Sequence, residues 1–198
     1  MSSKIGIMAK NREITYIDSF VASTSMIPEI IDRLYQDLSK MEYSRMEIDE
    51  IIISMDESIT NAVQATIKNP NKFAKNLYIT IRYSVSDTEF EATIIDHGTG
   101  FDLIQTLNTA PDNKSDDYHN QVISYTIDTE KSKSSLKINN KNVFLKGIGA
   151  GLKIILNFMD SVTIEYIDKK TIIAANVSES TDGTIFNMKR KRRDINNE

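Results

Sequence analysis

A glutamate and an asparagine, four positions apart, are the residues of this chain best suited to chemistry. Glu57 and Asn61 lie in the run ESITN. On a helix, this spacing places both side chains on one face, one turn apart. A glutamate can orient or deprotonate a hydroxyl group, and an amide oxygen can join phosphates and water around Mg²⁺. Taken alone, the pair could also be the polar stripe of an amphipathic helix, because this spacing often arises by chance.

A second candidate is the run DHGTG, residues 96–100, which directly follows an apolar segment. The carboxylate of Asp96 could accept a hydrogen bond from the exocyclic amine of adenine, a contact that guanine cannot offer. Gly98 and Gly100 let the backbone turn away where a side chain would block a flat ligand. Without the other motifs, the same run would be interpreted as a tight turn.

A third candidate is the glycine-rich run GIGAGL, residues 147–152, which opens a predicted helix. Gly147, Gly149 and Gly151 could present backbone N–H groups that bind phosphate with help from the helix dipole. Lys146 could add a positive charge, or it could be an ordinary exposed lysine. A dinucleotide-binding βαβ unit is the competing interpretation, with residues 143–145 as its strand. The G-x-G-x-G spacing and the polar residues before it disfavour that unit, and P-loop spacing is absent.

Two amphipathic helices are predicted before the second motif. The first covers residues 25–40, with Pro28 in its first turn, where a missing N–H costs nothing. The second begins at a capping box of Ser44 and Glu47, carries the first motif and ends near residue 69. Three- and four-residue spacing predicts its buried stripe: Ile48, Ile51, Ile52, Met55, Ile59, Ala62, Val63 and Thr66.

The strands fall mainly into two blocks. Glu13–Val21 is the first strand, and residues 77–85 and 90–95 form a hairpin that leads into Asp96. A short helix at 151–159 precedes strands at 161–167, 171–177 and 184–189, with turns at 168–170 and 180–183. Helices in one block and strands in another predict an α+β fold, a two-layer sandwich with helices on one face of a mixed, mainly antiparallel sheet.

The chain is predicted to form one domain, residues 13–190, with an extension at 1–12 and a basic and polar tail at 191–198. Residues 103–146 are polar and lysine-rich, and about forty residues are too many for an ordinary connection. We interpret them as an extended lid or a partly disordered segment, with a short helix at 116–129.

Composition narrows the classes of function. The net charge of −4 over 198 residues gives no general attraction to nucleic acid or anionic membrane. The dense basic run at 189–193 is predicted to be solvated rather than a docking or nucleic-acid site. The absence of cysteine excludes disulfides and thiol chemistry, which fits a reducing compartment. No apolar run could span a bilayer and the start lacks a signal-peptide core, so a cytoplasmic protein without membrane or direct nucleic-acid partners is expected.

Taken together and in this order, the three motifs resemble the Bergerat ATP-binding fold of the GHKL ATPases. Within that superfamily, the chain looks most like the small bacterial anti-sigma factor serine/threonine kinases. Residues 57–64 (ESITNAVQ) and 183–189 (GTIFNMK) are similar to their motif helix and closing strand. The resemblance covers residues 13–190 and implies that the segment at 103–146 is an ATP lid.

The resemblance also implies a role for each matched residue. Glu57 would be the general base, Asn61 would hold Mg²⁺ beside the nucleotide, and Asp96 would read adenine. Further nucleotide contacts are implied for Gly98, Gly100, Lys146, Gly147, Gly149, Gly151, Leu152 and Thr184. The implied cofactors are ATP and Mg²⁺.

The function implied by the resemblance is phosphoryl transfer in a partner-switching pathway. Such a kinase phosphorylates an anti-sigma factor antagonist and, as a homodimer, holds a sigma factor inactive until the antagonist displaces it. No helix with a phosphoacceptor histidine precedes the motifs and no transducer domain follows, so a sensor kinase or topoisomerase is not expected. Two alternatives remain open: a non-enzymatic regulator that binds ATP to shape a partner-binding surface, and an ATPase subunit of a larger machine.

We expect the segment at 103–146 to fold over nucleotide and partner and to exclude water. Deleting residues 112–140 should then weaken binding of nucleotide, of partner, or of both, as measured by titration calorimetry. Unchanged affinities for both would show that this segment is not a lid.

Overall fold

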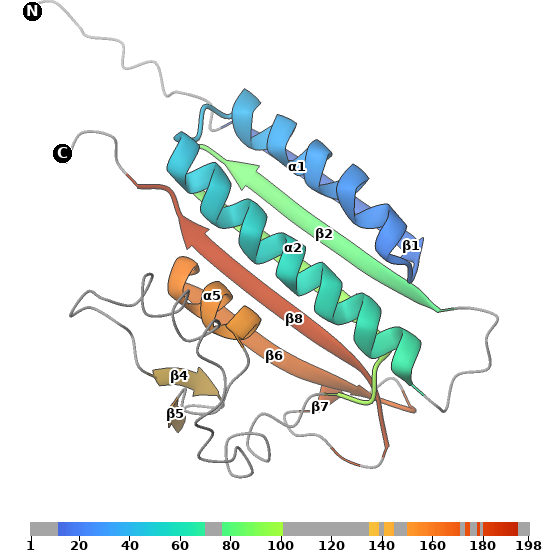
Figure 1. The fold of residues 1–198 in the computed structure, drawn as a ribbon. Helices are drawn as coiled ribbons and strands as arrows, with labels where there is room; N and C mark the ends of the chain where they lie inside the picture. Colours follow the sequence, from blue (N-terminus) through green and yellow to red (C-terminus); the bar gives the residue numbers. More distant parts are fainter. Residues whose placement is uncertain are drawn as a thin grey trace, which may run out of the picture.

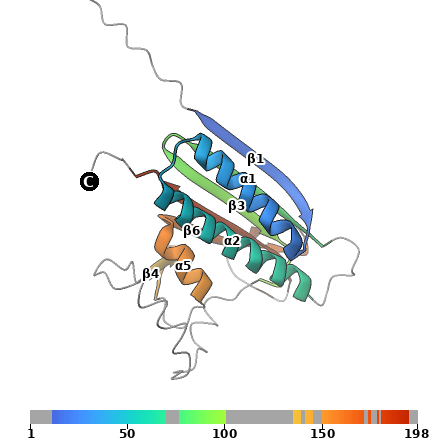
Figure 2. The same cartoon turned by 45° about the horizontal axis from the view of Figure 1, so that its top comes forward.

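Three described helices cover one face of a six-stranded sheet in the computed structural model (Figures 1 and 2). The structure describes residues 12–69, 77–100, 135–138, 141–144, 150–170, 173–174, 178 and 180–193. The helices are α1 (Ile27–Lys40), α2 (Arg45–Lys68) and α5 (Ala150–Phe158). The strands, in sheet order, are β1 (Glu13–Val21), β2 (Tyr78–Ser86), β3 (Glu89–Asp96), β8 (Thr181–Lys191), β6 (Ser161–Asp168) and β7 (Ile173–Ala174).

Every strand pair recorded in this sheet is antiparallel. The predicted α+β sandwich with helices on one face is therefore confirmed. The predicted mixture of parallel and antiparallel pairs is not found among the described strands. The central strand β8 joins β3 to β6, so the last strand of the chain lies in the middle of the sheet, beneath α2 and α5.

Both predicted helix starts are confirmed. A 3₁₀ turn at Thr24–Met26 leads into α1, and Pro28 lies in its first turn. At α2, the backbone N–H of Glu47 donates to Ser44 Oγ (3.3 Å), and the N–H of Ser44 donates to Glu47 Oε2 (3.1 Å). This reciprocal pair satisfies two N–H groups that a helix start otherwise leaves without partners.

The core lies between the helices and the sheet. All predicted stripe residues of α2 are buried except Ile52, which is partly buried and packs against the core. They meet the inward-facing residues of α1 and of the central strands: Ile30, Leu34, Leu38, Ile79, Ile81, Val85, Phe90, Ile94 and Met188. Alternation along β2 and β3 places mostly polar residues on the other face of these two strands.

One polar contact lies inside this layer. The hydroxyl of Tyr83 donates to Asp37 Oδ2 at 2.8 Å, and both residues are buried. Burial raises the pKa of Tyr83, and the hydrogen bond to Asp37 raises it further. Lys40 contacts the other carboxylate oxygen of Asp37 at 3.2 Å. Because buried polar groups need partners, this cluster ties α1 to the middle of β2.

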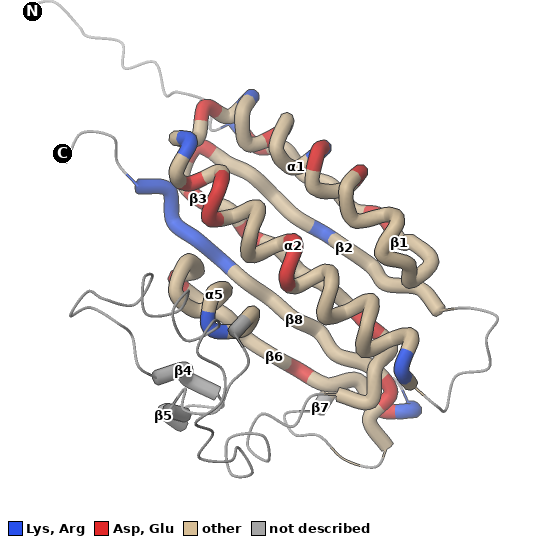
Figure 3. Tube along the Cα trace, in the orientation of Figure 1, with Lys and Arg blue, Asp and Glu red and all other residues tan. Residues whose placement is uncertain are grey.

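The basic run at 189–193 is only partly the solvated tail that was predicted: Lys191 and Arg193 are exposed, but β8 extends to Lys191 and Arg190 is buried. Figure 3 shows the run as the blue end of β8, beside acidic residues of α2. Arg190 is 1% exposed, pairs with Glu50 of α2 and donates to the carbonyl oxygen of Phe158 at 3.1 Å. Lys189 pairs with Glu89 and Glu91 on the open face of the sheet, at 2.7 Å each.

The folded part also extends beyond residue 190. The backbone N–H of Arg192 donates to Thr88 (2.8 Å), and its guanidinium lies 4.8 Å from the ring centre of Tyr43. The N–H of Arg193 donates to Glu47 Oε1 at 2.7 Å. Burial of Glu47 opposes its ionisation, but this hydrogen bond and those from Ser44 outweigh the effect and lower the pKa of Glu47. Arg192 and Arg193 therefore pack against the residues around the start of α2.

Two further details differ from the sequence-based expectation. Residues 135–138 and 141–144 form a separate antiparallel hairpin, β4 (Ser135–Ile138) and β5 (Lys141–Phe144), within the segment expected to be a lid. The strand considered for a βαβ unit is thus part of a hairpin. The predicted turn at 180–183 is also shorter, because β8 begins at Thr181. The predicted helix at 116–129 lies outside the described residues.

Among the described residues, no helix combines the length and the apolar character needed to cross a bilayer.

Replacing Arg190 should destabilise the fold far more than replacing the next residue. Arg190→Ala removes a buried guanidinium and leaves Glu50 without its closest partner, which should lower the free energy of unfolding by about 3 kcal/mol or more. The matched variant Lys191→Ala, at an exposed position, should change it by less than about 0.5 kcal/mol. Urea unfolding measures both, and equal small effects would restore the solvated-tail interpretation.

Candidate functional site

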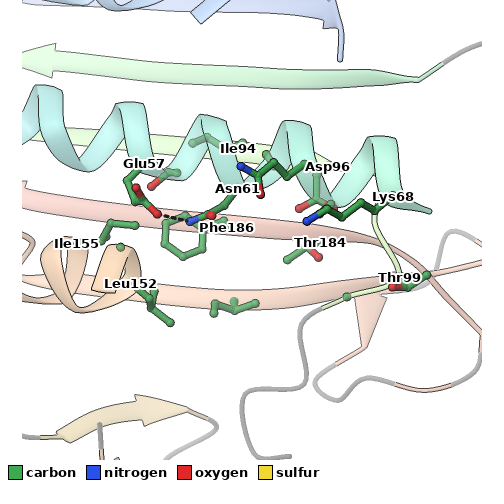
Figure 4. A pocket seen from close by; sticks show the side chains of 17 residues that line it. Glu57, Asn61, Lys68, Ile94, Asp96, Thr99, Leu152, Ile155, Thr184 and Phe186 are labelled. Carbon is green, nitrogen blue, oxygen red and sulfur yellow. Dashed lines mark hydrogen bonds between the residues drawn. The ribbon is translucent and has the colours of Figure 1, made fainter. Parts of the chain in front are cut away.

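A cavity of about 650 Å³ lies between α2 and α5, above the middle of the sheet (Figure 4). This volume lies within the usual range of small-molecule sites. The cavity is lined by seven of the predicted site residues: Glu57, Asn61, Asp96, Gly100, Gly151, Leu152 and Thr184. Segments far apart in the sequence thus meet at one place, as the three motifs required.

The first motif has the predicted geometry. Asn61 Nδ2 donates to Glu57 Oε1 at 3.1 Å, so the two side chains lie on one face of α2 and point into the same cavity (Figure 4). A carboxylate can only accept, so the amide must turn its nitrogen toward Glu57. That orientation leaves the amide oxygen of Asn61 as the group that can face a metal ion.

Gly151 brings α5 against Glu57. A Cβ atom at this position would lie 1.7 Å from Glu57 Oε1 and 2.1 Å from its Cδ. The carboxylate therefore occupies the space that any larger residue would fill. The third motif thus lies directly against the side chain of the first motif, in addition to the phosphate contact expected from the sequence.

Asp96 ends β3 at the other end of the cavity. It is 6% exposed, and the N–H of Gly98 donates to its Oδ1 at 2.7 Å. In the sheet, Asp96 pairs with Thr184 of β8, which also lines the cavity. Asp96, predicted to read adenine, and Thr184, predicted to contact the nucleotide, are therefore neighbours on adjacent strands.

The remaining predicted residues differ in their relation to the cavity. Gly100 has a φ of 81°, a left-handed conformation that glycine adopts without strain, which explains the glycine at the end of the second motif. Leu152 lines the cavity with other apolar side chains: Ile94, Ile155, Ile164 and Phe186. Gly98 contacts Asp96 but does not line the cavity. Lys146, Gly147 and Gly149 lie outside the described residues.

Several residues at the site were missed by sequence reasoning. Thr66 was assigned only to the buried stripe, yet its hydroxyl accepts from the N–H of His97 at 3.1 Å. Asn69 donates to the carbonyl oxygen of His97 at 2.7 Å. Lys68 lines the cavity beside Thr99 and Thr184 (Figure 4). A threonine within an apolar stripe was the one signal that pointed to a buried hydrogen bond here.

From the sequence, Gly183 was assigned to the turn at 180–183 and to the start of the closing-strand motif, with no specific role. A Cβ atom there would lie 2.6 Å from the carbonyl oxygen of Asp96, which is backbone and cannot swing aside. Glycine is thus required at this position for the close approach of β8 to the end of β3.

The groups that line the cavity suit the binding of a nucleotide with Mg²⁺. It has a carboxylate and an adjacent amide oxygen at one end, a buried carboxylate at the other, and an apolar wall between them. Oxygen ligands suit Mg²⁺, and an apolar wall suits a flat base. Among the described residues, no cluster of three or more histidine, cysteine, aspartate or glutamate side chains could hold a metal by itself.

No protein-family model matches the chain. In sequence, it is 28% identical over 127 residues to the serine-protein kinase RsbW of Bacillus subtilis (strain 168), a match that covers 64% of this chain and 62% of that protein. It is 34% identical over 65 residues to the serine-protein kinase RsbW of Bacillus licheniformis, covering 33% of this chain and 38% of that one. The chain therefore matches less than two thirds of the length of each of these curated relatives.

In structure, the chain matches a chain from the crystal structure of the SiaB-SiaC complex of Pseudomonas aeruginosa. The TM-score is 0.52 at 13% identity, and the match covers 89% of both chains. At this identity, the likeness concerns the fold. The sequence comparison confirms the resemblance inferred from the three motifs: the chain is similar to serine-protein kinases named RsbW.

Proposed function

We propose that this protein is an ATP-dependent serine/threonine protein kinase that acts on a separate protein in a partner-switching pathway. The observation that carries the proposal is the single cavity in which Glu57, Asn61, Asp96 and Gly151 meet, from three distant parts of the sequence. Similarity to two serine-protein kinases supports it.

The proposed nucleotide lies along α2. Asp96 would accept a hydrogen bond from the exocyclic amine of adenine near the end of α2, where Thr66 contacts His97. Glu57 lies nine positions earlier, so at about 1.5 Å per residue the two ends of the site are separated by about 14 Å along the helix. This span is comparable to an extended nucleoside triphosphate, which would place the terminal phosphate beside Glu57 and Asn61.

The phosphate end would be held by backbone and side-chain groups together. The N–H groups of Gly147 and Gly149, which precede α5 in the sequence, and of Gly151 in its first turn would bind phosphate oxygens, with a positive charge from Lys146. The amide oxygen of Asn61 would hold Mg²⁺, which neutralises charge on the triphosphate. Leu152, Thr184, Gly98 and Gly100 would shape the space around the nucleotide.

Glu57 would act on the incoming hydroxyl group. Its carboxylate accepts a hydrogen bond from Asn61 Nδ2 and lies against Gly151 at the end of the cavity. From there it can orient a serine or threonine hydroxyl and take its proton as the oxygen bonds to the γ-phosphorus, while the bond from that phosphorus to the β–γ bridging oxygen breaks and ADP leaves. Most of the rate enhancement would come from positioning and charge stabilisation, as is usual for phosphoryl transfer.

The proposed protein substrate is an anti-sigma factor antagonist domain, and the proposed second partner is a sigma factor, bound by a homodimer in the cytoplasm. The relationship to RsbW supports this assignment at the level of the family. A non-enzymatic ATP-binding regulator and an ATPase without a protein substrate are the alternatives that the experiment below distinguishes.

Glu57→Gln should abolish transfer while keeping nucleotide binding. The variant retains shape and the contact to Asn61 but cannot accept a proton, so phosphate on serine or threonine of candidate antagonist domains should fall by about a hundredfold or more. The affinity for Mg²⁺-ATP should change little. The matched control Asp56→Asn neutralises the preceding carboxylate, which is exposed and outside the cavity lining, and should leave transfer unchanged.

The outcomes separate the three functions. Tight ATP binding by the wild type without transfer to any candidate favours the non-enzymatic regulator. ATP turnover that needs no protein substrate favours the ATPase. Equal transfer by wild type and Glu57→Gln would remove Glu57 from the mechanism.

Gly151→Ala should impair transfer through Glu57. The added methyl group displaces the carboxylate, and a misplacement of about 1 Å can cost about a hundredfold in rate. Introduced into Glu57→Ala, where the displaced group is absent, the same change should cause little further loss. Phosphate-transfer rates of the two single variants and the double variant measure this coupling, and independent, multiplying effects would argue against it.

A further inference from the structure

The last turn of α2 holds one residue of the second motif by both of its backbone groups. The N–H of His97 donates to Thr66 Oγ1 at 3.1 Å, and the carbonyl oxygen of His97 accepts from Asn69 Nδ2 at 2.7 Å. His97 directly follows Asp96. The peptide groups on either side of His97 are therefore fixed relative to the helix that carries Glu57 and Asn61.

Both side chains that form this clasp are shielded from water. Thr66 is 0% exposed and Asn69 is 6% exposed. A polar group in such a position is costly unless it is hydrogen-bonded, so the loss of either bond would leave an unsatisfied buried group. The clasp is thus a rigid connection and not an exchangeable surface contact.

The segment that contains Asp96 is confined on two more sides. Toward α2, a Cβ atom on Gly98 would lie 2.8 Å from Ala65 Cβ, so the backbone packs directly on the helix. Toward the sheet, Gly183 approaches the carbonyl oxygen of Asp96 so closely that no side chain would fit. The carboxylate itself accepts the N–H of Gly98 at 2.7 Å. Between described residues, the clasp adds side-chain hydrogen bonds from α2 to these steric contacts.

We propose that Thr66 and Asn69 are positioning residues that set the base selectivity of the cavity, because they hold Asp96 in the orientation that accepts an amine at C6 of a purine. The inference rests on the proposed function, since it concerns the nucleotide that this cavity would bind. Neither residue lines the cavity, so both act through Asp96.

The chemistry of selection depends on the direction of the carboxylate. An adenine amine donates to a carboxylate, whereas the C6 oxygen of hypoxanthine presents a lone pair to it and is repelled. A site built around a fixed hydrogen-bonding group rejects the wrong partner strongly, because the buried group is then left unpaired. If Asp96 can tilt, the adenine contact weakens and the repulsion of hypoxanthine weakens with it.

Thr66→Val tests this by removing the acceptor while keeping the size of the side chain. Titration calorimetry in the presence of Mg²⁺ measures the affinities for non-hydrolysable analogues of ATP and of inosine triphosphate. The selectivity is the affinity for the ATP analogue divided by that for the inosine analogue, and this is the ratio that is compared. We expect Thr66→Val to lower this ratio about tenfold, in line with the loss of one buried hydrogen bond. Thr66→Ser, which restores the hydroxyl, should return the ratio to near the wild-type value.

The matched control is Thr80→Val. Thr80 Oγ1 makes a 2.8 Å hydrogen bond with Ser19 on the open face of the sheet, away from the cavity, so its loss should leave the ratio unchanged. If Thr66→Val does not fold, Asn69→Ala removes the other half of the clasp and should lower the ratio in the same way. A loss of stability alone would shift both affinities equally and leave their ratio intact.

The results separate this inference from the proposed function. A wild-type protein that binds ATP and transfers phosphate, with an unchanged affinity ratio in the folded Thr66 and Asn69 variants, would overturn only the positioning role. A wild-type protein that binds neither nucleotide analogue would overturn the proposed function, and the inference with it.

Discussion

The packing of one long helix across the sheet is the constraint on which this structure depends. Helix α2 buries an apolar stripe over most of its length, and that burial fixes its rotation about its own axis. Glu57 and Asn61 lie beside the stripe and not on it, so they cannot turn away from the cavity without removing Ile59 and Val63 from the core. The orientation of the candidate catalytic pair is thus a consequence of hydrophobic burial.

Both ends of α2 are anchored to strands by polar contacts. At its start, Glu47 accepts the N–H of Arg193, and Glu50 pairs with Arg190, so the end of β8 is tied to the helix. At its other end, Thr66 and Asn69 hold the residue after β3. Helix and sheet therefore form one frame, and the distance between the two ends of the cavity is set by the length of a rigid helix.

Local patterns predicted the parts of this frame that depend on neighbours in sequence. The capping box at Ser44, the stripe of α2 and the hairpin that leads to Asp96 all follow from spacing within a few residues. The role of Arg190 could not be predicted in this way, because its partner Glu50 is 140 positions away and a run of basic residues is usually solvated. The contact between Gly151 and Glu57 could not be predicted either, because the two residues are far apart in the sequence. The glycine also already had an explanation as part of a phosphate-binding pattern.

The buried end of β8 also bears on how the chain resists proteolysis. Five consecutive lysine and arginine residues would form an obvious cleavage site for a trypsin-like protease in an extended tail. In the fold, Lys189 and Lys191 are part of a hydrogen-bonded strand, and Arg190 is enclosed between α2 and the end of α5. A protease that needs an extended, accessible backbone could cut after Lys189 or Arg190 only once β8 has left the centre of the sheet. Cleavage at either of these two bonds would therefore report global unfolding and not local fraying.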